Sequence, residues 1–298
     1  MSRRGQLLFL AMGLIWGIPY LLIKVAVREL TVPQLVFART APAALLLVPL
    51  AWRRGYLRPL CRQWRAVLLY TAVEVAGPWF LLSSAEKRLS SSVSGLLIAM
   101  VPLIGAGLVL VTGQGNDRLD RRRLVGLLVG IAGVAALVGV DLRGNDLLAV
   151  GEVALTALGY AAGPMIISRR FADLPGLGLI AASFALTAAG YAPFALAHPV
   201  GHLSLEVVGA VATLTLVCTT VAFLLFFALI VEVGPARATV ITYVNPAVAV
   251  ALGVVLLGEP FTAGIALGFP LILAGSYLAT RATRPALTPA VRTGRPSG

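Results

Sequence analysis

The sequence is poor in charged residues, and acidic residues are the scarcest. Only 12% of its 298 residues are charged, 59% are hydrophobic, and the mean hydropathy is +0.93. A soluble domain typically has about 25% charged residues, so a water-soluble fold would have to bury too much apolar surface. Long apolar stretches spread along the whole chain instead predict an α-helical protein that crosses a bilayer repeatedly.

Cysteine and histidine are almost absent. Cys61 lies in a basic loop and Cys218 in an apolar run, which excludes a disulfide framework or a thiolate metal site. The two histidines, His198 and His202, share one loop, and two ligands are too few for a metal centre. We therefore expect no metal and no cofactor. The chain also has no glycine-rich Walker motif, which argues against ATP as the energy source.

Basic residues are present in excess, with 24 Lys and Arg against 12 Asp and Glu. They form short clusters between apolar runs and do not line one amphipathic face. This pattern indicates contact with anionic lipid headgroups and a fixed membrane topology, and it argues against a nucleic-acid partner.

Segments of about 20 apolar residues, the length that spans a bilayer, recur along the chain. Short segments of turn-forming and charged residues separate them, for example Arg53-Arg54-Gly55 and Gly258-Glu259-Pro260. Ten spans are predicted, at residues 5–24, 33–52, 65–85, 92–112, 123–141, 148–168, 176–197, 206–230, 236–257 and 262–280. The first lacks a small-residue cleavage site, so we interpret it as an uncleaved helix.

The basic residues predict the orientation of these spans. If the N-terminus is cytoplasmic, 18 Lys and Arg fall on the cytoplasmic side and 5 on the other, and Arg39 lies inside the second span. This positive-inside bias places both termini in the cytoplasm of a cell that carries the protein in its inner or plasma membrane. Residues 282–298, rich in Pro, Thr, Arg and Gly, are predicted to form a disordered cytoplasmic tail.

The two halves of the chain resemble each other. At an offset of 144 residues Pro49 falls on Pro193 and Pro102 on Pro246, and after a two-residue change Gly126 falls on Gly268. Residues 1–141 and 148–281 are therefore predicted to be two repeats of five spans each. Because five is odd, the second repeat enters the membrane inverted, as in many secondary transporters. The predicted fold is an all-α membrane protein with ten transmembrane helices in two inverted five-helix repeats.

Several segments resemble a known family. The first span, Gly13 to Lys24, the Phe37-Ala38-Arg39 element of the second, and the long stretch from Val233 through Leu257-Gly-Glu-Pro260 are similar to the EamA family of the drug/metabolite transporter (DMT) superfamily. The resemblance covers roughly residues 6–280. It implies a transporter that exports amino acids or other small metabolites, without indicating which one.

Two charged residues within spans are candidates for the transport site. Glu74 lies in the middle of the third span, where a carboxylate costs about 2.5–3.5 kcal/mol on insertion scales. It either binds a substrate ammonium group or a coupling proton, or is a structural partner of Arg39 or of a backbone group. Arg39 either contacts a substrate carboxylate or has a structural and gating role, by pairing with Glu74 or reaching the interface.

Aromatic residues and interrupted helices add further candidates. Trp16, Trp79, Tyr160 and Tyr243 are interpreted as lining a substrate cavity, whereas Tyr20 and Trp52 fit an interfacial belt. Pro102 and Pro246, at matching positions of the two repeats, either interrupt their helices at a gating point or merely kink them. Asn245, beside Pro246, either bonds a freed carbonyl group or binds substrate.

These patterns predict a secondary transporter, not an enzyme. We expect it to export a small polar metabolite such as an amino acid by alternating access, driven by protons or by exchange. The alternative is a flippase for a lipid-linked carrier or a membrane scaffold component. An intramembrane enzyme is disfavoured because Glu74 is the only clear mid-span acid. The expected partners are the metabolite and the bilayer, for a monomer or a homodimer.

Overall fold

The computed structural model describes residues 2–112, 121–141, 146–234 and 238–280, and these are built from helices. The tail predicted at 282–298 lies outside the described residues. The first repeat contains α1 Arg3–Ile15, α2 Pro19–Ala26, α3 Val32–Arg53, the short α4 Arg58–Cys61, α5 Trp64–Tyr70, η1 Thr71–Ala76, α6 Gly77–Ala85, α7 Ser91–Ile98, α8 Val101–Thr112 and α9 Arg121–Asp141. The second contains α10 Leu147–Arg170, α11 Gly176–Leu196, α12 Leu205–Thr215, η3 Leu216–Val221, α13 Ala222–Val233, η4 Thr239–Tyr243, α15 Asn245–Leu257 and α16 Ala263–Thr280.

Long apolar helices dominate the part of the chain that the structure describes. Nine of them are long and apolar enough to cross a bilayer, and Ile241–Leu257 is a tenth, shorter apolar helix. The ninth predicted span, 236–257, is shorter than expected because it begins with the tight 3₁₀ turn η4, and residues 235–237 lie outside the described ranges. The prediction of an all-α membrane protein is confirmed.

The outer surface of the helices is apolar. Leu45, Val111, Val231 and Val255 are all at least three-quarters exposed. In water such a surface would be unfavourable, but hydrocarbon chains solvate it well. The helices satisfy their own backbone groups, as a bilayer requires. These exposed side chains therefore face lipid.

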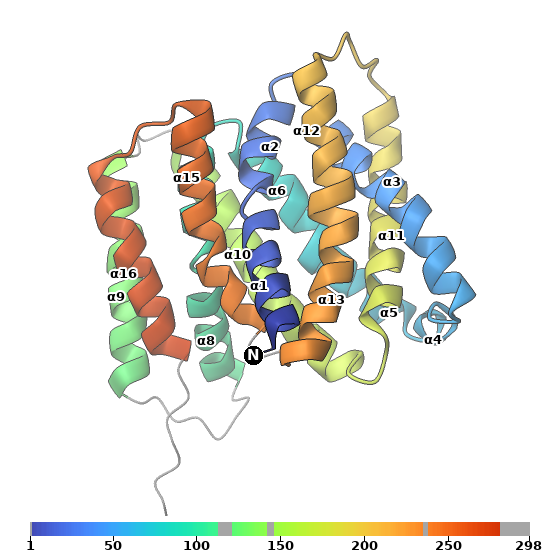
Figure 1. Ribbon diagram of the computed structural model, residues 1–298, viewed down its shortest axis with the longest axis horizontal. Coiled ribbons are helices and arrows are strands. Elements are labelled where there is room, and N and C mark those ends of the chain that lie inside the picture. The colour runs from blue at the N-terminus through green and yellow to red at the C-terminus, as the bar shows by residue number, and fades with distance from the viewer. Residues whose placement is uncertain (1, 113–120, 142–145, 235–237, 281–298) are drawn as a thin grey trace, which may run out of the picture.

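Successive spans alternate in direction, and the N-terminus and the end of α16 lie on the same face of the molecule (Figure 1). We call this the terminal face and the opposite one the distal face. Each repeat contributes five spans, so α1 and α10, the first helices of the two repeats, run in opposite directions. The predicted inversion of the second repeat is confirmed.

The last helices of the two repeats, α9 and α16, pack backbone against backbone (Figure 1). A Cβ atom added at Gly126 would lie 2.8 Å from the carbonyl oxygen of Gly275, and one added at Gly268 would lie 2.9 Å from that of Gly133. The alignment of the repeats that pairs Gly126 with Gly268 also pairs Gly133 with Gly275, so each of these two contacts is the counterpart of the other. The glycine pattern therefore serves a two-fold contact between repeats within one chain.

Both repeats depart from regular α-helix at matching places. The third span of each contains a six-residue π-helical segment, η1 or η3, and η3 starts 145 residues after η1. The fourth spans are interrupted, before Val101 in one repeat and before Asn245 in the other. Pro102 and Pro246 each occupy the second position of the helix that follows the break, where the missing N–H group is not needed.

Candidate functional site

Arg39 lies on α3, between the two repeats, and is only 8% exposed. Its guanidinium carbon is 3.6 Å from the ring centroid of Trp79, on α6 of the same repeat. Its Nε–H donates a hydrogen bond of 2.8 Å to the hydroxyl of Thr219, on η3 of the other repeat. The cation–π contact and the hydrogen bond offset part of the cost of burying the charge.

A chain of aromatic rings connects Arg39 to the first helix. The ring of Trp79 is 5.4 Å from that of Phe184, Phe184 is 5.6 Å from Phe223, and Phe223 is 5.6 Å from Trp16. These rings come from α6, α11, α13 and the end of α1. They form an apolar, aromatic layer beside Arg39, to which both repeats contribute.

Two tyrosines complete the surroundings of Arg39. Tyr160, on α10, interacts with Arg39, Glu74 and Trp79. Tyr20, on α2, also interacts with Arg39 and is only 7% exposed. The assignment of Tyr20 to an interfacial belt was therefore wrong, because packing of α2 against α12 and α7 turns it inward. Trp52, by contrast, is 71% exposed and fits the belt.

Glu74 lies in η1, with its carboxylate against Gly163 of α10. A Cβ atom at Gly163 would overlap the carboxylate oxygen Oε2 of Glu74, so only a glycine at position 163 leaves room for this carboxylate. Oε2 is buried and has no hydrogen-bond partner among the described residues. Among the described residues, neither Glu74 nor Arg39 takes part in an ion pair. The alternative in which Glu74 neutralises Arg39 by a direct ion pair is therefore not found.

The charges of this cluster come from one repeat only. By the offsets of the repeat, Arg39 corresponds to Ser183, and Glu74 corresponds to Thr219. Ser183, the counterpart of Arg39, forms a hydrogen bond of 3.0 Å between its hydroxyl and that of Thr71 on η1. The backbone symmetry is therefore retained, whereas the charged chemistry is asymmetric.

The remaining predicted residues lie elsewhere. Tyr243 bonds its hydroxyl to Thr280 at 2.9 Å, near the end of α16. Asn245 is buried at the start of α15, where its backbone packs on Gly17, in the break between α1 and α2. The structure thus brings together Trp16, Arg39, Glu74, Trp79 and Tyr160, and places Tyr243 near the end of α16 and Pro102 and Pro246 at the starts of α8 and α15.

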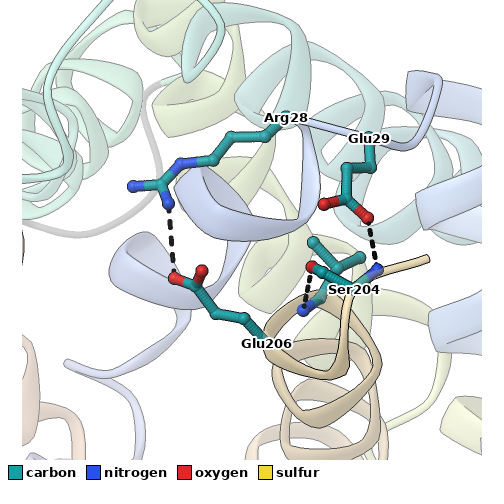
Figure 2. Close-up of polar contacts among 5 residues, drawn as sticks. Arg28, Glu29, Ser204 and Glu206 are labelled. Atoms are coloured by element: carbon teal, nitrogen blue, oxygen red, sulfur yellow. Dashed lines mark hydrogen bonds and ion pairs between the residues drawn. The ribbon is translucent and has the colours of Figure 1, made fainter.

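The distal face is tied together by polar contacts between the repeats (Figure 2). Arg28 pairs with Glu206 at 3.3 Å, and a carboxylate oxygen of Glu29 accepts a hydrogen bond of 2.8 Å from the backbone N–H of Ser204, the N-cap of α12. This backbone hydrogen bond, and a second interaction with the Ser204 side chain, lower the pKa of Glu29. Both contacts join the α2–α3 turn to the start of α12.

A second group of contacts closes the distal face beside the first. Glu259, in the turn before α16, accepts hydrogen bonds from the backbone N–H groups of Ser91 and Ser92 at 2.7 and 2.9 Å. It therefore caps the N-terminus of α7, where a negative charge is favourable. The sequence marked Glu259 only as part of a turn. Nothing local to that turn reveals its partner in the other repeat.

Together, the inverted repeats, the apolar exterior and the buried polar cluster between the repeats define a membrane transporter. The model of the EamA-like transporter family matches residues 3–139 and again residues 147–281. The chain belongs to this family, within the drug/metabolite transporter superfamily.

Similar proteins are also named as transporters. The uncharacterized inner membrane transporter YedA of Escherichia coli (strain K12) is 29% identical over 296 residues, which are 95% of this chain and 94% of YedA. An uncharacterized transporter of Archaeoglobus fulgidus is 26% identical over 291 residues, or 94% of this chain and 98% of that protein. A solved structure, titled only as the crystal structure of a protein, has a TM-score of 0.66 at 22% identity and covers 94% of this chain and 98% of its own. That likeness concerns the fold alone.

Proposed function

We propose that this protein is a secondary transporter that exports a small metabolite with a carboxylate group, such as an amino acid. The observation that carries the proposal is Arg39, a buried cation at the repeat interface with no carboxylate within 4.0 Å among the described residues. A guanidinium matches the planar geometry of a carboxylate and binds it with paired hydrogen bonds. A substrate carboxylate would supply the missing counter-charge.

The other members of the cluster fit the rest of such a substrate. Glu74 is a buried carboxylate that interacts with Tyr160, which in turn interacts with Arg39. It offers a place for an ammonium group or, when the substrate leaves, for a proton. The rings of Trp79, Phe184, Phe223 and Trp16 would contact an apolar side chain.

Alternating access follows from the same architecture. The contacts of Glu29, Arg28 and Glu259 across the repeats close the distal face in this structure. Rocking of one inverted repeat against the other would break these contacts and open the site to the distal side. The α9–α16 glycine contact provides a close-packed axis for that motion.

A flippase for a lipid-linked carrier is less well supported. It would need basic residues along an opening to the bilayer. A lateral hollow of about 590 Å³ does lie between α8 and α10, but its only charged residue is Glu152, which is already paired with Arg88 at 2.6 Å. Its lining residues are Ile104, Leu147, Leu148, Gly151, Glu152, Ala154, Leu155 and Leu158. Such a surface does not attract an anionic headgroup.

The orientation of the protein is a testable part of the proposal. The charge distribution predicts that both termini are cytoplasmic, so the distal face is outside. A fluorescent or phosphatase reporter fused after Gly298 should report the cytoplasm, whereas one inserted in the 141–146 loop should report the outside. Reversed signals from both fusions would refute this orientation.

The substrate class can be tested with matched compounds in proteoliposomes. We use L-phenylalanine as the probe because aromatic rings line the site, and measure counterflow of the labelled compound. Unlabelled phenylalaninamide, which lacks the carboxylate, is expected to compete about 10- to 100-fold more weakly than phenylalanine, because Arg39 is then left without its partner. 3-Phenylpropionate lacks the ammonium group, so it is likewise expected to compete more weakly than phenylalanine if Glu74 binds that group. Equal competition by the amide would overturn the carboxylate assignment.

A further inference from the structure

A second buried carboxylate, that of Glu86, lies toward the distal face and interacts electrostatically with Tyr20, which also neighbours Arg39. Glu86 follows α6 directly, and its side chain is 0% exposed. Neither of its carboxylate oxygens has a hydrogen-bond partner among the described residues. An ionised carboxylate in such a position would lose its hydration without replacement, which is strongly unfavourable. In this closed arrangement the neutral, protonated form is favoured.

The nearest cation does not neutralise Glu86 by a direct ion pair. The ammonium group of Lys24 donates instead to the backbone carbonyl oxygens of Glu86 and Leu89, at 2.7 and 2.6 Å. Glu259, the acid from the other repeat that caps α7, also acts on Glu86 electrostatically. One positive and two potential negative charges therefore meet where the repeats close.

The other helices packed near Glu86 add little compensating charge. From α7, the hydroxyl of Ser94 faces Glu86. From α10, Glu152 bonds to Ser84 and pairs with Arg88 at 2.6 Å, so these two charges offset each other. Burial raises the pKa of Glu86 well above its usual value; the Lys24 charge and the Ser94 hydroxyl oppose this rise, and the Glu259 charge adds to it.

We propose that Glu86 is a proton-binding site that couples protonation to closure of the distal face. When the face is closed, Glu86 is buried beside Glu259 and holds a proton. When the face opens, Glu259 moves away with its own repeat, water reaches Glu86, and the proton leaves. This inference rests on the alternating access proposed above but does not depend on the identity of the substrate.

The sign of the pH effect follows from linkage. Because Glu86 has the higher pKa in the closed state, closure binds a proton, so low pH favours the closed distal face. This stabilisation is fully present below the pKa of the open state and is lost as the pH rises through that of the closed state. Raising the pH should therefore open the distal face.

A cysteine at position 91 can report this opening. Ser91 is fully buried at the closed face, and serine and cysteine are similar in size. In a background with Cys61→Ser and Cys218→Ala, Ser91→Cys protein in nanodiscs is treated with a maleimide at pH 5.5 to 8.0. We compare chains with Glu86 and with Glu86→Gln, so that the intrinsic pH dependence of the thiol cancels. The labelling rate should rise about five- to tenfold more with Glu86 than with Gln.

The outcomes separate this proposal from its alternatives. Identical pH profiles with Glu86 and with Glu86→Gln would overturn it. If the Gln variant does not fold, Glu86→Met, which is similar in length and cannot titrate, replaces it, and a profile identical to that with Glu86 would equally overturn the proposal. Asp173→Asn, at an exposed acid in the loop between α10 and α11, is expected to leave the profile as it is. Since no substrate is present, pH-dependent labelling in a protein that does not transport phenylalanine would reject phenylalanine as the substrate and still support the proton site at Glu86.

Discussion

Replacing Arg39 with lysine is expected to lower the rate of phenylalanine transport in proteoliposomes by about 10- to 100-fold, although the positive charge is retained. A lysine ammonium group cannot present two parallel N–H donors to a carboxylate, and hydrogen bonds to charged groups contribute about 1.5–3 kcal/mol. The lysine would also lose the planar stacking on Trp79 and the Nε–H bond to Thr219. The measurement is the initial rate as a function of phenylalanine concentration.

A matched variant controls for the loss of an arginine as such. Arg54 is the exposed C-cap residue of α3, so Arg54→Lys makes the same chemical change at the end of the same helix without touching the site. It should transport at the rate of the original chain. An Arg39→Lys protein that is folded and fully active would show that Arg39 is structural, and the carboxylate-binding role would be abandoned.

Glu74→Gln is expected to fold but to lose the dependence of transport on a pH gradient. Glutamine keeps the shape and hydrogen-bonding capacity of glutamate but cannot release a proton. With the original chain, an imposed pH gradient should accelerate phenylalanine transport severalfold. With the variant, the rates with and without the gradient should be equal. Gradient-driven transport by Glu74→Gln would assign Glu74 a structural role.

Gly163→Ala tests the same carboxylate without altering its chemistry. The added methyl group would occupy the space that the Glu74 carboxylate now fills, and must displace it. We expect this variant to lose much of its transport while the carboxyl group still titrates. Gly151→Ala on the same helix is the control, because a Cβ atom there meets no atom within 4 Å. Equal activity of the two variants would show that the position of Glu74 is not critical.

The fold could be predicted from the sequence because its main determinants are local. Hydropathy over about 20 residues decides whether a helix is stable in a bilayer, and the odd number of spans in each repeat fixes the inversion. Pro102 and Pro246 could also be placed, because proline is tolerated best in the first turn of a helix. The 3₁₀ start of the ninth span was missed, since no single residue of Thr239–Tyr243 specifies it.

The candidate site could be predicted only in part. Arg39 and Glu74 stand out because a charge within an apolar span is costly wherever the helix packs. Whether the two pair directly depends on the positions of α3, α5, η1 and α6, and the structure shows that they do not. Tyr20 and Thr219 gave no signal, because a tyrosine near a helix end and a threonine in an apolar run are common in membrane helices.

By itself, the sequence determined that this protein is an all-α membrane protein of two inverted five-helix repeats, since hydropathy, proline and glycine act over short distances along the chain. Only the tertiary structure decided that Arg39 faces Thr219 of the other repeat, and that Glu86 is buried beside Glu259. These contacts join residues 180 and 173 positions apart. They depend on the relative placement of whole helices, which the packing of the repeats sets and no local pattern encodes.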